Sequence, residues 1–184
     1  MKGKITWFTF LVLAFSTAAH VFAADAEIPS TGYPIKIDGV MDIAWPGAAP
    51  RQVANVVQGA ASPTGCSGSW RALWDPQYLY VFIDVNDDAL YHDNPVAEDY
   101  QDDGVEVFID IHNNKATSYG TDDYQYRFNW DATTPVINFQ HGTTTDGIDF
   151  AILTTDTGYT CEARFPWTLL YQNQGGPSVG DLMG

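Results

Sequence analysis

The sequence has few cysteines, few basic residues and little helical periodicity. Its 184 residues include only two cysteines, and no Cys/His spacing suggests a zinc, iron–sulfur or attached-haem site. Lysine and arginine together number 8, against 23 aspartates and glutamates. So acidic a surface repels phosphate backbones and anionic lipid, which argues against nucleic-acid and membrane partners. The acidity fits a neutral ligand, divalent cations or a salty habitat equally well.

The one long apolar run lies at the start of the chain. Lys2 and Lys4 precede a nearly uninterrupted apolar stretch up to Ala19, and a small-residue cleavage site ends at Ala23. This pattern predicts a secretory signal over residues 1–23, shorter than a typical membrane span. Its removal would leave 161 residues, enough for one domain with its own core. The mature protein is therefore expected to be secreted or periplasmic.

The two cysteines are Cys66 and Cys161, both in strand-like contexts. In an exported protein two cysteines can pair, so we predict a disulfide between them. A bridge that closes so long a loop would stabilise the fold by roughly 4 kcal/mol on the chain-entropy model.

Beyond the signal, short strand-like runs alternate with turns rich in Asp, Asn, Gly and Pro, as in antiparallel sheets. Helical character is confined to one turn near 167–171, and a long acidic loop spans 86–103. We predict an exposed leader at 24–34 and one all-β domain at 35–184, an antiparallel β-sandwich of immunoglobulin or jelly-roll type. Strands are expected at 34–39, 69–74, 78–85, 104–111, 124–130, 136–140, 150–155 and 159–165.

The last residues, Val179–Gly184, form an apolar run that looks like a strand just beginning. A sandwich cut at this point would leave an unpaired strand edge, which is an association hazard. We therefore expect the sequence to be a fragment of a longer gene product, with the domain truncated at its C-terminal end.

Two of the predicted strands, 104–111 and 124–130, carry an unusual polar face. Successive side chains of a strand point to opposite sides, so each of these strands has an apolar and a polar face. Planar groups with several hydrogen-bonding atoms suit the paired hydroxyls of a sugar, whereas an ordinary solvent face is the alternative. Phe108 would line such a site or pack under a loop. The positions on this face are Glu106, Phe108, Asp110, Gln125, Arg127 and Asn129.

Aspartates gather in the loop region before the first of these strands. Clustered carboxylates together with asparagine oxygens are what calcium requires, although a solvated acidic loop is the alternative. We predict structural calcium with Asp87, Asp88 and Asp102 as ligands. The aspartates of this region are Asp84, Asp87, Asp88, Asp93, Asp99, Asp102 and Asp103.

The same residues do not suggest an enzyme. Glycoside hydrolases need two carboxyl groups roughly 5–9.5 Å apart. Glu106 and Asp110 share a face, but four residues of a strand separate them by about 13 Å. His92, His112 and His141 show no spacing typical of a nucleophile, and no serine or cysteine triad is recognisable.

Five short segments form an ordered set from Ile37 almost to the end of the chain. In this order they resemble motifs of the family 9 carbohydrate-binding modules, a xylanase-associated family with a DOMON-like β-sandwich. Each segment is weakly specific alone, and the order makes the resemblance specific. The segments are Ile37–Trp45, Leu73–Val81, Asp103–Asp110, Tyr126–Asn129 and Gly158–Trp167.

The resemblance implies a non-catalytic module that binds plant-type polysaccharide such as xylan or cellulose, or its reducing end, next to a covalently linked hydrolase. It also implies structural calcium. By position, Tyr100 stands where such modules place one of two stacking rings, normally a Trp. Glu106, Gln125, Arg127 and Asn129 fall on positions that would hold the sugar hydroxyls. The second ring belongs to C-terminal strands that this sequence lacks.

Two other classes of function stay open. DOMON-like sandwiches also serve as haem-binding electron-transfer modules with axial Met, His or Lys. The candidates here are Met41, Met183 and the three histidines of the mature chain, among which no ligand pair stands out. The other class is an acidic structural domain of a cell-surface protein without a glycan site.

Overall fold

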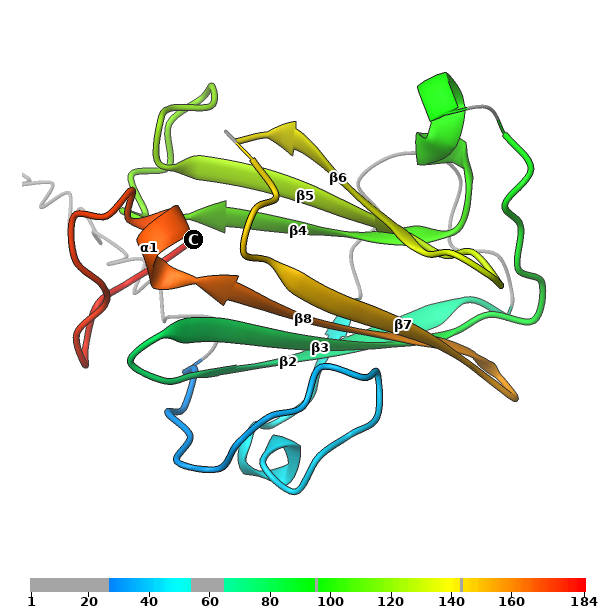
Figure 1. Cartoon of the computed structure of the whole chain (residues 1–184), viewed down its shortest axis with the longest axis horizontal. Helices are drawn as coiled ribbons and strands as arrows, with labels where there is room; N and C mark the ends of the chain where they lie inside the picture. Colours follow the sequence, from blue (N-terminus) through cyan, green and yellow to red (C-terminus); the bar gives the residue numbers. More distant parts are fainter. Residues whose placement is uncertain (1–26, 54–64, 95, 143) are drawn as a thin grey trace, which may run out of the picture.

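The computed structural model describes residues 27–53, 65–94, 96–142 and 144–184. Two antiparallel sheets face each other (Figure 1), with strand orders β1-β2-β3-β8-β7 and β4-β5-β6. The prediction of an all-β sandwich is confirmed. The elements are η1 (Trp45–Gly47), β1 (Arg51–Val53), β2 (Ser67–Trp74), β3 (Tyr78–Asn86), η2 (Val96–Gln101), β4 (Gly104–Asp110), β5 (Asp123–Asn129), β6 (Val136–His141), β7 (Asp149–Thr155), β8 (Gly158–Pro166) and α1 (Trp167–Leu170).

The main core lies between the two sheets and follows from the period-two alternation of their strands. Tyr126 and Phe128 of β5 and Phe165 of β8 are fully buried there. The Phe165 ring centroid lies 5.5 Å from that of Tyr126 and 6.1 Å from that of Phe128. Each such side chain stabilises the fold by roughly 1.5–3 kcal/mol through burial. The interlocked rings fix the small sheet on the large one.

A second, smaller core lies on the outer face of the five-stranded sheet. Residues 27–50, here called the covering segment, run below that sheet in Figure 1. Ile35 and Trp45 of the segment pack against Tyr80 and Phe82 of β3, with the rings of Trp45 and Phe82 5.4 Å apart. Strand β3 is apolar on both faces because both faces are covered.

A buried carboxylate anchors the covering segment. Glu162 of β8 accepts hydrogen bonds from the backbone N–H groups of Asp38 (3.0 Å) and Gly39 (2.9 Å) and from Nε1 of Trp45 (2.9 Å). Burial raises the pKa of Glu162, although these three donors favour its charged form. Gly39 has φ +78°, and a Cβ there would lie 2.8 Å from the Leu153 side chain. The first and last sequence motifs thus meet at this carboxylate.

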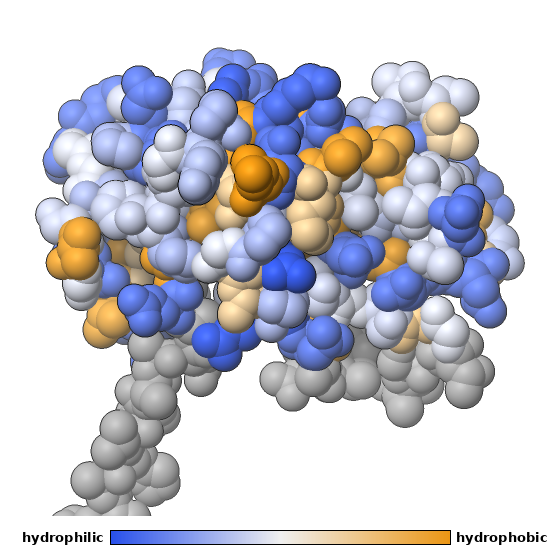
Figure 2. All heavy atoms as spheres, turned by 90° about the horizontal axis from the view of Figure 1, so that it is seen from below, coloured by the Kyte–Doolittle hydropathy of each residue, from blue (hydrophilic) through white to orange (hydrophobic). Residues whose placement is uncertain are grey.

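Seen from below, the side formed by the covering segment mixes hydrophilic and hydrophobic residues without one continuous apolar patch (Figure 2). The exposed large apolar side chains of this segment are Tyr33, Val40, Met41 and Ile43. Single exposed apolar residues are normal on a protein surface.

Seven of the eight predicted strands are present within two residues of their expected bounds. The strand expected at 34–39 is wrong, because this stretch lies over the sheet face rather than in a ladder. The leader is attached by an isolated parallel bridge between Ser30 and Trp74. Among the described residues, no helix is long and apolar enough to cross a membrane; the predicted signal at 1–23 lies outside them.

The predicted disulfide between Cys66 and Cys161 is wrong. Strands β2 and β8 flank β3, which alone separates them by about 9–10 Å. Cys161 lies opposite Ile83, whereas Ser67, directly after Cys66, lies opposite Asn86 at the far end of β3. A disulfide requires Cα atoms within about 7 Å. Cys161 is instead a buried core thiol, and its burial raises its pKa.

The final run Val179–Gly184 forms no ladder strand, but its last residue pairs with the free edge of β4. The Asp110 N–H donates to the Gly184 carbonyl (2.7 Å), and the Gly184 N–H donates to the Asp110 carbonyl (2.8 Å). This reciprocal pair is typical of antiparallel neighbours.

Candidate functional site

The outer face of the three-stranded sheet presents polar and aromatic side chains, as the alternation predicts. The ladder places Glu106 of β4 opposite Arg127 of β5, and Arg127 opposite Asn138 of β6. Figure 1 shows η2 rising above one end of this face and the β4–β5 connection above the other. The face is therefore bounded at both ends.

Arg127 is the centre of a hydrogen-bonded network on this face. Its Nε donates to Glu106 Oε1 (2.6 Å) and its Nη1 to Asp99 Oδ1 (2.8 Å), while Nη2 also contacts Glu106. Glu106 Oε2 accepts from Gln125 (2.8 Å), and Asp99 Oδ2 accepts from Asn138 (2.8 Å). These contacts use three of the five guanidinium N–H donors. The network holds a planar cation between two carboxylates, with donors left for a ligand.

Tyr100 supplies an aromatic ring at the edge of the network. It belongs to η2, and 62 % of its surface is exposed. The Arg127 Cζ lies 5.9 Å from the Tyr100 ring centroid, within cation–π range. An exposed ring next to fixed polar groups can pack on the C–H face of a pyranose while those groups bind its hydroxyls.

Asn129 lies on this face but is covered by η2. Its side chain is 1 % exposed, and its Nδ2 donates to the backbone carbonyl of Asp99 (2.7 Å). Its Oδ1 is buried without a hydrogen-bond partner among the described groups. In this structure Asn129 therefore positions η2. The structure brings Glu106, Gln125 and Arg127 together with Tyr100 beside them.

Two members of the network were missing from the predicted site, Asp99 and Asn138. Asp99 was assigned to the acidic loop, since nothing in the sequence says that η2 folds back onto β5. Asn138 sits two residues after Val136 in a predicted strand. Its polar position was visible, but its pairing with Arg127 depends on the order β4-β5-β6.

Asp102 is the best placed of the predicted calcium ligands. Its side chain is fully buried, and its Oδ1 accepts hydrogen bonds from the backbone and side chain of Asn94. Its Oδ2 has no hydrogen-bond partner, although the His92 Nδ1 lies 3.5 Å away. The hydrogen bonds from Asn94 help to lower the pKa of Asp102, which favours the carboxylate.

The other two predicted ligands do not join it. Asp87 Oδ1 accepts from the backbone N–H of Ala89 (3.0 Å), and the Asp88 carboxylate lies against Gly65. Across the described ranges, no three His, Cys, Asp or Glu side chains gather in a group that could hold a metal ion.

The histidines named as haem candidates are engaged with protein groups. His92 lies between Asp102 and Asp131, and His112 Nδ1 is 3.0 Å from Asp122 Oδ2. His141 Nε2 is 2.9 Å from the carbonyl oxygen of Gly120. This arrangement does not favour the haem alternative.

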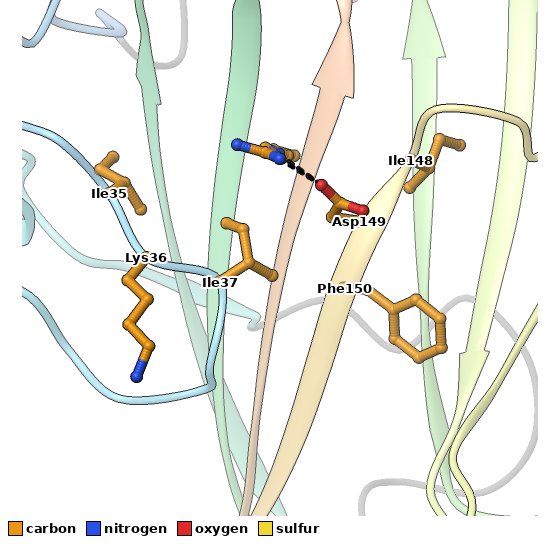
Figure 3. A pocket seen from close by; sticks show the side chains of 7 residues that line it. Ile35, Lys36, Ile37, Ile148, Asp149 and Phe150 are labelled. Atoms are coloured by element: carbon orange, nitrogen blue, oxygen red, sulfur yellow. Dashed lines mark hydrogen bonds and ion pairs between the residues drawn. The ribbon is translucent and has the colours of Figure 1, made fainter.

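A separate depression of about 620 Å³ lies between the covering segment and β7. Figure 3 shows Ile35, Lys36 and Ile37 on one side and Ile148, Asp149 and Phe150 on the other. Its one arginine, Arg164, is ion-paired with Asp149 and stacked on Tyr78 at 4.7 Å. Lys36, the other cation of the lining, is paired with Asp38. The charged groups here are thus engaged in ion pairs, so the polar face of the small sheet is the stronger candidate.

A β-sandwich with an exposed ring beside a fixed polar network has the form of a ligand-binding module. A family model described as "Carbohydrate family 9 binding domain-like" matches residues 37–184. The chain belongs to this family, and it is a non-catalytic carbohydrate-binding module.

Its curated relatives include proteins named as polysaccharide hydrolases. The chain is 34 % identical over 166 residues to "Endo-1,4-beta-xylanase A" of Thermoanaerobacterium saccharolyticum, and 35 % identical over 137 residues to "Exoglucanase XynX" of Acetivibrio thermocellus. These alignments cover 89 % and 74 % of the chain but 13 % and 12 % of the relatives. The chain therefore corresponds to a small part of each.

Solved structures share the fold. A family 9 carbohydrate-binding module from Caldicellulosiruptor kristjanssonii in complex with glucose is 28 % identical, with a TM-score of 0.68. The match covers 86 % of this chain and 74 % of that one. A structure of such a module from the same organism with cellotriose has a TM-score of 0.65 at 28 % identity, and that match covers 85 % of this chain and 72 % of that one.

Proposed function

We propose that the outer face of the three-stranded sheet binds the end of a neutral plant-type glycan such as cellulose or xylan. The observation that carries this proposal is the Arg127 network beside the exposed Tyr100 ring. Arg127, Glu106 and Gln125 offer donors and acceptors to adjacent hydroxyls, while the ring covers the apolar face of the sugar. The neighbouring structures named for glucose and cellotriose support a glucose-type sugar.

Calorimetry with cellobiose, xylobiose and their reduced alditols tests this function. We expect saturable binding of the free sugars, loss of binding with the alditols, and loss of binding in Arg127→Ala. Arg164→Ala is the matched control, because it removes an ion-paired arginine from the other depression. Absence of heat with every sugar, from protein shown to be folded, would overturn the proposal. Equal loss in both variants would show that Arg127 acts only through stability.

We also propose that the module is exported and works beside a linked hydrolase. The basic start and apolar run of residues 1–23 support export. The hydrolase names of the relatives, of which the chain covers a small part, support the linkage. Binding would raise the local concentration of the hydrolase on its polymer without any chemistry of the module's own. Retention of the secreted protein on insoluble xylan or cellulose tests this role.

A third proposal is structural calcium at Asp102. Its buried Oδ2 supports the proposal, because a cation would satisfy an oxygen that accepts no hydrogen bond. Asp87 and Asp88 would have to turn toward Asp102 to join it. Calcium held there would stiffen the loop between β3 and β4, which carries Tyr100.

A further inference from the structure

A second aromatic group occupies the other end of the same sheet face. Phe108 of β4 is 56 % exposed, two residues along the strand from Glu106 and on the same side of the sheet. Tyr119, in the β4–β5 connection, is 52 % exposed. Neither side chain packs under a loop or in a core. Together they line a depression of about 480 Å³ at this end of the sheet.

The aromatic pair is connected to the Arg127 network through hydrogen bonds. Phe108 lies opposite Gln125 in the ladder. Gln125 Nε2 donates to Glu106 Oε2 (2.8 Å), and Gln125 Oε1 accepts from the Tyr119 hydroxyl (2.8 Å). A chain of contacts therefore runs without interruption from Arg127 to Tyr119.

The Tyr119 ring is held in place as well as exposed. It stacks on the His141 ring with centroids 4.5 Å apart and planes at 15°. His141 is itself fixed by its contact with the Gly120 carbonyl. A ring immobilised before binding loses little conformational freedom when a ligand packs on it. Tyr119 therefore presents an exposed ring whose orientation is fixed by the protein.

We propose that Phe108 and Tyr119 form a second subsite, which binds further sugar units of the same glycan chain that the Arg127 network holds. The inference rests on the proposed function. Four residues of β4, from Gly104 at the Tyr100 end of the face to Phe108, span about 13 Å. This is longer than two pyranose units, so a chain that starts at Tyr100 and follows β4 reaches Phe108 with its third unit.

The chemistry of the depression fits a neutral polysaccharide. Phe108 and Tyr119 provide apolar area for C–H faces, while Asp110, Asp123 and Ser118 at its edge provide oxygen atoms for hydroxyls. The lining carries two carboxylates, those of Asp110 and Asp123, against the one ammonium group of Lys115. Together with the net charge of −15, this excess of acidic groups disfavours an anionic ligand.

Calorimetry with a series of cello- and xylo-oligosaccharides from the disaccharide to the hexasaccharide tests the subsite. In the wild type, affinity should rise with chain length. Phe108→Ala should keep disaccharide affinity and lose roughly tenfold in affinity for the longer sugars, the usual worth of one aromatic contact. Tyr33→Ala, which removes an equally exposed ring from the covering segment, should retain the full series.

The outcomes separate this inference from the proposed function. Disaccharide binding without any gain from chain length, or an unchanged series in Phe108→Ala, would overturn the subsite alone. Absence of binding at every length would overturn the function and the subsite together. The Phe108 ring protons give an independent measurement by NMR. They should shift with the tetrasaccharide and remain unchanged with the disaccharide, and a tetrasaccharide without effect on them would overturn the subsite.

Discussion

The outer faces of the two sheets differ although their strands alternate in the same way. On the five-stranded sheet, Tyr80 and Phe82 point outward and are buried by the covering segment. On the three-stranded sheet, Glu106 and Arg127 point outward, and the rings of Tyr100 and Phe108 remain exposed beside them. The outer face of the five-stranded sheet is part of a second core, and the outer face of the three-stranded sheet is a surface that can form hydrogen bonds with a ligand. An open face can keep hydrogen-bond donors and acceptors that no protein group uses and that a ligand can bind. On a covered face, every polar group must find its hydrogen-bond partner within the protein.

Substitution of Trp45 should loosen the covering segment and expose the outer face of the five-stranded sheet, as the outer face of the small sheet is exposed. It should also lower the free energy of unfolding more than any of the changes below. Trp45 is fully buried and donates to Glu162. We expect Trp45→Ala to lower the free energy of unfolding by about 3–5 kcal/mol, the usual cost of deleting a large core aromatic. Urea denaturation measures it. Ile43→Ala, at a 77 % exposed position of the same segment, is the control. Equal stability of the two variants would contradict the role of the covering segment.

Calcium should stabilise the loop region beside the open face. At free calcium about 100 times its Kd, the gain is about 2.7 kcal/mol, or roughly 5–10 °C in Tm for a domain of this size. Thermal unfolding with calcium and with EDTA measures the gain. Asp102→Asn should remove the difference between the two conditions. If EDTA leaves the Tm of the wild type unchanged, the proposal of calcium at Asp102 is refuted.

Changes at Tyr100 should alter the open face without disturbing the covered one. Because the ring is exposed, Tyr100→Ala should leave the free energy of unfolding nearly unchanged and weaken disaccharide binding about tenfold. Tyr100→Trp should strengthen it a few-fold, since a larger ring covers more of the sugar. Calorimetry and urea denaturation on the same samples separate the two effects. Unaltered affinity in both variants would remove Tyr100 from the site.

The smallest expected effect concerns a turn at the end of the small sheet. Hydrogen bonds from the hydroxyl and backbone of Thr133 and from the backbone of Thr134 lower the pKa of Asp131 to about 2. A carboxylate with a lowered pKa stabilises the fold above its unfolded pKa of about 3.9, and this contribution is lost as pH falls through 2.

Asp131→Asn should therefore be slightly less stable than the wild type at pH 7, and the difference should vanish near pH 2. Denaturation between pH 7 and pH 2 follows it, and the NMR titration of Asp131 gives its pKa directly. A titration near the ordinary value for aspartate would show that these hydrogen bonds do not favour the charged form.

The successes and errors of the sequence-based predictions have a common cause. Period-two alternation is local, so strands such as 104–111 and their polar face were predictable. Asp99, Asn138 and the role of Glu162 were not, because each acts through a residue at least 28 positions away. The stretch 34–39 resembles a strand because its apolar and polar residues alternate. A segment that packs over the face of a sheet shows the same alternation as a strand within the sheet. The disulfide failed for the same reason, since pairing depends on strand order and register.

An all-β domain of family 9, with sugar-compatible groups on one face of two strands, could be recognised from the sequence alone. Local periodicity and ordered motifs carry that information. The tertiary structure was needed to show that Arg127 is held between Asp99 and Glu106, that Asn129 is covered, and that Phe108 is exposed. Each of these features depends on which strands become neighbours and which segment folds back over them. The contacts concerned join residues far apart along the chain, and no local sequence pattern reveals such contacts.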